Sequence, residues 1–257
     1  MIRPVETLVI DGRFRGPARS GNGGYAAGAL AGIARELTGD AWPATTVRLR
    51  LPPPLDVPMD VVRDGDAVVA TYDGEVVAQA TAGAAPVAVA PVSVEVARAA
   101  EATYPGLASH PFPTCFSCGP GREPGDGLRI FPGLVAELDG RPRVAATWTP
   151  HPSVAGDAPD GAPEDDRLRA RLPVVWAALD CAGAWAADVG ERPMVLGSMT
   201  ARVDSLPLVG ETHVVVGHDR GREGRKNFTA TSIYDPSGGL VAAAEHVWIT
   251  VDPAAFN

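Results

Sequence analysis

Residues 72–80 read YDGEVVAQA, and residues 234–244 read YDPSGGLVAAA. When a two-residue insertion is allowed in the second stretch, the Tyr-Asp pair, a glycine, a Val-Ala pair and a final alanine coincide. Each stretch belongs to a pair of strand-like segments, and its Asp-Gly or Asp-Pro-Ser-Gly residues are typical of a hairpin loop. Similarity at two distant places indicates an internal repeat, which decides how the rest of the chain is interpreted.

The elements that precede the two hairpins come in the same order. Residues 22–37 and residues 172–189 each have the composition of a helix. A strand-like segment and a proline-marked bend follow each helix: TTVRLRL and PPPLDVP in the first half, VLGSMTARV and SLPLVGE in the second. This order predicts an α+β fold of two units, residues 1–108 and 109–257, each with a sheet that wraps its own helix. Between them, Ser93 is expected to cap a short helix that runs to Ala102.

The composition is that of an ordinary globular protein. Of 257 residues, 46% are hydrophobic and 21% are charged, and the formal net charge is -9. Because nucleic-acid binding needs a basic surface, this charge argues against a nucleic-acid partner. The N-terminus has no uninterrupted apolar stretch, and no apolar run is long enough to span a bilayer. We therefore expect a cytoplasmic protein without a membrane partner.

Two of the three cysteines lie in a segment between the units, HPFPTCFSCGPGREPGDGLRIFPG, residues 110–133. A zinc site commonly has four ligands, but only one Cys-x-x-Cys pair is present. The other candidate ligands have no ligand-like spacing: His110, His151 and Cys181. A redox pair would lie at a helix start after a strand, whereas Gly-Pro-Gly follows here. We therefore expect no metal, interpret Cys115 and Cys118 as reduced packing residues, and predict that residues 126–133 begin the first strand of the second unit.

The second helix contains a carboxylate in an unfavourable place. Asp180 is the only charged residue between Pro173 and Asp188, so this helix is apolar on all faces and should be buried. A buried carboxylate is costly unless it is used or satisfied by hydrogen bonds. Asp180 is therefore either a functional acid or a structural one, bonded to a neighbour such as Ser198 or Thr200.

The first helix begins with two glycines. Gly23 and Gly24 lie where backbone N–H groups are unpaired and where the helix dipole favours negative charge. Glycine also lets a ligand approach the backbone closely. The structural alternative is that Asn22 caps the helix and that the glycines fit a tight turn.

Together these motifs resemble those of the hotdog-fold acyl-CoA thioesterases, in a double-hotdog form with two tandem units in one polypeptide. The resemblance is carried by NGGYAAGAL, AALDCAGAWA, SMTARVDSLPLVGE, DGEVVAQA, GGLVAAAEHVWI and CFSCGPGREPGDGLRIFPG, and by the order of helix, strand, bend and hairpin that both halves share. It implies two units, each a long central helix wrapped by an antiparallel sheet, joined as one pseudo-dimer. It also implies hydrolysis of an acyl-CoA or acyl-carrier thioester without a cofactor, in a chain that forms homo-oligomers.

The resemblance implies one composite site. In the family a helix starts with a Gly-Gly pair and carries an acid eight positions later, and the glycines of one subunit face the acid of the other. Here the eighth position after Gly23 is Ala31, and the eighth position before Asp180 is Leu172. The two halves have lost complementary parts, so Gly23 and Gly24 should act together with Asp180. The amides would bind the thioester oxygen, and Asp180 would act as general base or as nucleophile.

Other site residues are implied in the same way. Ser198 or Thr200 would supply a hydroxyl from the strand after the second helix. In the substrate-positioning shell, Asn22 stands where a histidine is common and Gly16 where a glutamine or asparagine is common. A basic cluster suits the phosphates of coenzyme A or is a solvated hairpin tip: Arg220, Arg222, Arg225 and Lys226. Small residues leave room for an acyl chain or allow tight helix packing: Gly28, Ala29, Ala31 and Gly32. The alternative function is non-catalytic acyl or CoA binding, with Asp180 purely structural.

Overall fold

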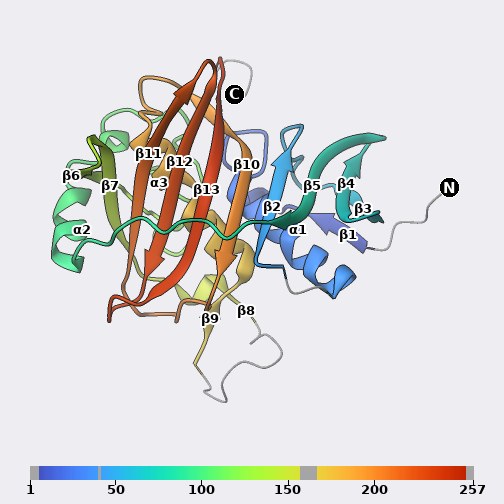
Figure 1. Ribbon diagram of the computed structural model, residues 1–257, viewed down its shortest axis with the longest axis horizontal. Coiled ribbons are helices and arrows are strands. Elements are labelled where there is room, and N and C mark those ends of the chain that lie inside the picture. Colours follow the sequence, from blue (N-terminus) through green and yellow to red (C-terminus); the bar gives the residue numbers. More distant parts are fainter. Residues whose placement is uncertain (1–5, 40–41, 157–166, 253–257) are drawn as a thin grey trace.

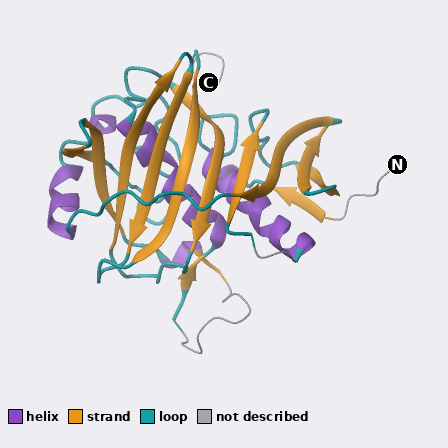
Figure 2. Ribbon diagram, in the orientation of Figure 1, coloured by secondary structure: helices purple, strands orange, loops and turns teal. Residues whose placement is uncertain are grey.

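Two long helices lie side by side against one face of a single antiparallel sheet (Figures 1 and 2). The computed structural model describes residues 6–39, 42–156 and 167–252. The helices are α1 (Gly23–Thr38), α2 (Val94–Glu101) and α3 (Leu172–Ala186), with short 3-10 turns at Gly12–Phe14, Pro105–Leu107 and Pro152–Val154. In the described part of the chain, no helix is both long enough and apolar enough to cross a membrane.

The sheet contains eleven strands within the described residues, in the order β1-β3-β4-β5-β2-β10-β13-β12-β11-β7-β6. The central pair, β2 and β10, is antiparallel and joins the two halves of the chain. From this pair outward the order of strands is the same on both sides, with β6 as an extra edge strand. The strands are β1 (Glu6–Val9), β2 (Ala44–Leu49), β3 (Pro58–Asp64), β4 (Ala67–Tyr72), β5 (Glu75–Gly83), β6 (Gly133–Leu138), β7 (Arg141–Trp148), β10 (Met194–Val203), β11 (His213–Glu223), β12 (Lys226–Tyr234) and β13 (Leu240–Thr250), and a separate short pair is β8 (Ala155–Gly156) and β9 (Arg169–Ala170).

Local signals explain where the elements begin and end. The side-chain oxygen of Asn22 accepts a hydrogen bond from the Tyr25 amide at 2.8 Å, and α1 ends before Gly39, whose φ is 64°. The hairpin between β4 and β5 turns at Asp73 and Gly74, both of which have positive φ. The structure therefore agrees with the two predicted helices to within three residues at each end and with the predicted hairpin.

The segment between β5 and α2 crosses the outer face of the second half of the sheet, opposite the long helices (Figure 1). The amide of Val89 donates to Ser232 Oγ at 2.9 Å, and the Tyr234 hydroxyl donates to the Val89 carbonyl. Ser93 caps α2 through the Val96 amide, as predicted. This connection therefore covers part of the outer face of the sheet and leaves the helix-bearing face for the site.

Two predictions about strands differ from the structure. The predicted separate sheets form one continuous sheet, because β2 and β10 pair directly. The predicted strand over residues 126–133 is wrong, since β6 starts only at Gly133. The amides of Leu128 and Ile130 instead donate to the carbonyls of Phe116 and Ser117 at 2.7 and 2.9 Å. Those amides are satisfied within the connecting segment and are not available to a sheet.

Candidate active site

Asp180 lies in the middle of α3 with its carboxylate at the N-terminus of α1. One carboxylate oxygen, Oδ2, accepts hydrogen bonds from the Gly24 amide at 3.0 Å and from Asn22 Nδ2 at 2.8 Å. The residue is only 2% exposed. The other oxygen, Oδ1, is buried and has no hydrogen-bond partner among the described residues. An acceptor without a protein partner is unusual in a folded protein and makes Asp180 a candidate functional residue.

Two glycines of α1 allow α3 to approach this closely. A Cβ added at Gly24 would lie 2.6 Å from the Trp176 carbonyl oxygen and 2.7 Å from the Asp180 Cβ. A Cβ at Gly28 would lie 2.6 Å from the Trp176 Cβ. Gly28 therefore serves helix packing, one of the two alternatives for the small residues, and Gly24 lets the Asp180 carboxylate reach the amide.

Asn22 organises the start of α1. Its Oδ1 accepts from the Tyr25 amide, while its Nδ2 donates both to Asp180 and, at 3.7 Å, to Cys115 Sγ. The Gly24 amide is occupied by Asp180, and no acceptor for the Gly23 amide is present among the described residues. Gly23 therefore retains the free N–H group at this helix end.

A pocket of about 280 Å³ opens beside these groups and is lined by Asn22, Gly23 and Asp180. Its walls come from the bend after β2, the start of β10 and the end of β13, and they are largely apolar: Leu49, Leu51, Met194, Leu196, Trp248 and Ile249. Among the described residues that line it, Arg50 is the only cation. The pocket thus combines an apolar space, a carboxylate oxygen and a backbone N–H donor.

The surroundings of Asp180 shift its pKa in opposite directions. Burial raises the pKa of Asp180 to about 7, and the nearby Cys115 adds to this rise, while hydrogen bonds from Gly24 and Asn22 lower it. The donors therefore offset only part of the desolvation of the carboxylate. A perturbed acid in a pocket is a feature of functional sites.

The structure does not bring Ser198 and Thr200 to the pocket. Strand β10 has an irregularity between Leu196 and Ser198, and Met199 points into the core beneath the helices. Side chains alternate along a strand, so Ser198 and Thr200 lie on the opposite face, where Thr200 Oγ1 is 2.8 Å from Thr46 Oγ1. The irregularity could not be located from the sequence.

The basic cluster also lies outside the pocket lining. Arg222, Arg225 and Lys226 are exposed at the turn between β11 and β12. The Arg225 carbonyl accepts from the Thr250 amide at 2.9 Å, so this turn lies beside a strand end that borders the pocket. Sequence reasoning missed Arg50, whose only signal was its position directly before the proline-marked bend.

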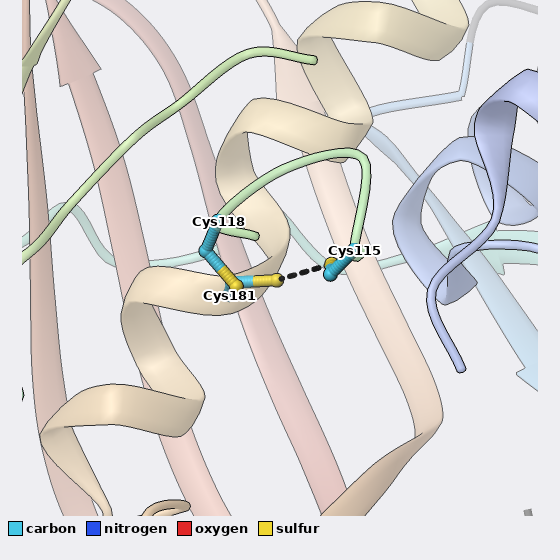
Figure 3. A group of neighbouring side chains, drawn as sticks. All are labelled: Cys115, Cys118 and Cys181. Carbon is cyan, nitrogen blue, oxygen red and sulfur yellow. Dashed lines mark hydrogen bonds between the residues drawn. The ribbon is translucent and has the colours of Figure 1, made fainter. Parts of the chain in front are cut away.

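The three cysteines come together next to Asp180, which the spacing along the chain did not indicate. Cys115 and Cys118 approach from the connecting loop and Cys181 from α3 (Figure 3). All three are free of disulfides, and Cys115 and Cys181 line the pocket. The one available signal was that Cys181 directly follows the buried acid in the sequence.

No protein-family model and no curated protein matches the sequence. Solved structures do match. The tesB protein of Mycobacterium avium subspecies paratuberculosis is 14% identical with a TM-score of 0.57, over 96% of this chain and 92% of that one. A protein from Alicyclobacillus acidocaldarius, described as having a hot dog fold, is 15% identical with a TM-score of 0.56, over 96% of this chain and 93% of that one. The fold is the hotdog fold.

A third solved structure, from Thermobifida fusca and named as a proposed thioesterase II, is 15% identical with a TM-score of 0.57. The match covers 98% of this chain and 96% of that one. Identities at this level establish a shared hotdog fold and leave activity to be argued from the residues of the site.

Proposed function

We propose that this hotdog protein hydrolyses an acyl thioester of coenzyme A or of an acyl carrier, at one composite site between its two halves. The observation that carries the proposal is Asp180, held at the amide end of α1 with one buried carboxylate oxygen unpartnered beside a pocket. The names of the structural relatives from Mycobacterium avium and Thermobifida fusca, tesB protein and proposed thioesterase II, favour the same reaction class.

The proposal includes a tandem architecture of two hotdog units, residues 1–108 and 109–257, joined as a pseudo-dimer. It is supported by the identical order of strands outward from the β2–β10 pair and by the one long helix in each half. Gly23 and Gly24 come from the first unit and Asp180 from the second. Neither unit alone holds the complete set, so the site depends on both.

In the proposed reaction the thioester carbonyl oxygen accepts a hydrogen bond from the free Gly23 amide, which stabilises the negative charge that develops on it. The Gly24 amide and Asn22 hold Asp180 through Oδ2. Oδ1 takes a proton from a water molecule, whose oxygen attacks the carbonyl carbon. The C–S bond then breaks, the proton passes to the leaving sulfur, and a carboxylic acid and a thiol are formed. In the alternative route Oδ1 attacks directly, and water hydrolyses the resulting anhydride.

The pocket favours a substrate with a small acyl group. Its volume of about 280 Å³ lies near the lower end of the usual range for ligand pockets, about 300–1,000 Å³. The apolar walls suit the acyl group, whereas the phosphates of a carrier are too polar for them. We assign the phosphates to the rim, where Arg50 can pair with them.

The decisive experiment is a thiol-release assay over a panel of acyl-CoA esters, with the wild type and Asp180→Asn. Asn keeps the shape of the side chain but cannot take a proton, so we expect kcat to fall about 100-fold or more. Asp188→Asn, the same change at the exposed end of the same helical region, is the matched control and should leave kcat unchanged.

Undiminished activity in Asp180→Asn would refute the site. A wild type that binds acyl-CoA but releases no thiol from any ester would instead support non-catalytic binding. Label in Asp180 after a single turnover in ¹⁸O-labelled water would identify the anhydride route, because water enters the Asp180 carboxyl group only by attack on its anhydride carbonyl.

A further inference from the structure

The three sulfur atoms form a compact group. Cys115 Sγ and Cys181 Sγ are 3.6 Å apart, and all three Sγ atoms lie within 4.8 Å of one another (Figure 3). A zinc ion binds thiolate sulfur at about 2.3 Å in a tetrahedron, which places neighbouring sulfurs about 3.8 Å apart. The observed spacing therefore needs only small side-chain adjustments to hold such an ion.

N–H groups are directed at these sulfurs. Asn22 Nδ2 donates to Cys115 Sγ at 3.7 Å, and His110 Nε2 lies 3.3 Å from Cys118 Sγ. The Phe112 amide donates to His110 Nδ1 at 2.9 Å, so the proton of the neutral ring resides on Nε2 and points at the sulfur. Buried thiols that only fill space need no such donors, whereas thiolates are stabilised by them. The two donors thus match the outer hydrogen bonds that commonly orient and support metal-bound side chains.

The loop that carries Cys115 and Cys118 is held against its surroundings. Ser117 Oγ donates to the Ala177 carbonyl of α3 at 2.7 Å, and the Tyr104 hydroxyl donates to the Cys118 carbonyl at 2.9 Å. The turn closes through the Gly119 amide, which donates to the Cys115 carbonyl at 2.9 Å. A Cβ at Gly119 would lie 2.5 Å from the Pro113 carbonyl oxygen, so this position requires glycine. These contacts position the two loop sulfurs beside Cys181 without help from an ion.

We propose that Cys115, Cys118 and Cys181 form a three-thiolate site for Zn²⁺, with its fourth position open to the pocket. Cys115 and Cys181 both line the pocket, which provides a path for the ion and room for a water as fourth ligand. His110 acts as a hydrogen-bond donor to Cys118, because its Nε2 carries the proton.

Among thiophilic ions, the charge balance favours Zn²⁺ over Cu⁺. Three thiolates in a buried place carry three negative charges, and a divalent ion neutralises one more of them than a monovalent ion does. The proposed zinc site does not depend on thioester hydrolysis. The two sites share one residue, since Asn22 Nδ2 donates both to Cys115 and to Asp180. A bound ion would add one more link between the connecting loop and α3, beside the hydrogen bond from Ser117 Oγ to the Ala177 carbonyl.

The test uses the full chain, purified under reducing conditions and stripped of metal with a chelator. Titration with Cd²⁺ should produce the ultraviolet absorption of cadmium–thiolate bonds and saturate at one ion per chain. Zn²⁺ at about 100 times its dissociation constant should raise Tm by about 5–11 °C. Each of Cys115→Ser, Cys118→Ser and Cys181→Ser should abolish the absorption at this stoichiometry. The control His151→Gln, which removes an exposed histidine, should not change it.

A measurement on the wild type avoids dependence on variants that fail to fold. Zn²⁺ should protect all three thiols together from alkylation, as read by mass spectrometry. Free thiols with no cadmium absorption, no change in Tm and no protection would overturn the proposal and leave the cysteines as packing residues. Loss of binding in His110→Gln equal to that in the cysteine variants would overturn the assigned ligand set. All these readouts are independent of hydrolysis, so a chain without thioesterase activity still tests the zinc site.

Discussion

The substitution Gly24→Ala tests the helix contact on which the site depends. The added methyl group would lie 2.6 Å from the Trp176 carbonyl oxygen, whereas an ordinary contact begins at 3.4 Å, so α3 must move away by roughly 0.8 Å. The contact between the Gly24 amide and Asp180 Oδ2, now 3.0 Å, would lengthen with it. Since a misplacement of about 1 Å can cost about 100-fold in rate, we expect kcat/KM to fall by about that factor.

The stability effect has a matched comparison in the same helix. Overpacking costs about 1–3 kcal/mol, which corresponds to a fall in Tm of about 2–12 °C for a chain of this size. At Gly32 a Cβ meets only Leu172 Cδ2 at 3.7 Å. Gly32→Ala should therefore gain the helix propensity of alanine, about 0.5–1 kcal/mol, and raise Tm by about 1–4 °C.

Thermal unfolding and the thiol-release assay on both variants test whether the close approach of α1 and α3 positions Asp180. Opposite shifts in Tm, with activity lost only in Gly24→Ala, are the expected pattern. The contrary result is a Gly24→Ala variant with the same Tm as Gly32→Ala and a kcat/KM within about twofold of the wild type. That result would show that the close approach of α1 and α3 does not position Asp180.

Two further predictions concern the rim of the pocket and the core. Arg50→Gln should raise KM for acyl-CoA about tenfold at nearly constant kcat, because it removes the cation that lines the pocket. Arg48→Gln, two residues earlier in β2 and outside the pocket lining, is the control. A larger effect from Arg225→Gln would assign the phosphate contact to the β11–β12 turn. Burial lowers the pKa of His246 to about 4, so the neutral ring is favoured in the folded state. As pH falls from about 6.5 to about 4, His246 takes up a proton in the unfolded chain but not in the folded one, which lowers the free energy of unfolding by about 3 kcal/mol. Urea unfolding at both ends of this range should show a smaller pH-dependent loss in His246→Phe than in the wild type, and an equal loss would assign the acid sensitivity to other groups.

Much of the fold followed from local patterns. The apolar run around Asp180 predicted a buried helix, and α3 is buried with Asp180 inside it. The glycine pair and Asn22 predicted a helix start, and Asn22 caps α1. These signals depend on neighbours along the chain, through the helical period, the cap and the turn, so they can be interpreted without knowledge of the rest of the molecule.

The sequence by itself therefore indicated the repeat, the two long helices, a glycine-rich helix start and a buried acid, and the family resemblance suggested that the last two act together. Only the tertiary structure decided which groups meet. The irregularity in β10 turned Ser198 and Thr200 away from the pocket, the bend after β2 brought Arg50 to it, and the connecting loop carried Cys115 and Cys118 to Cys181. Such encounters depend on strand pairing and on the distance between two helices, which arise from contacts between residues far apart in the chain.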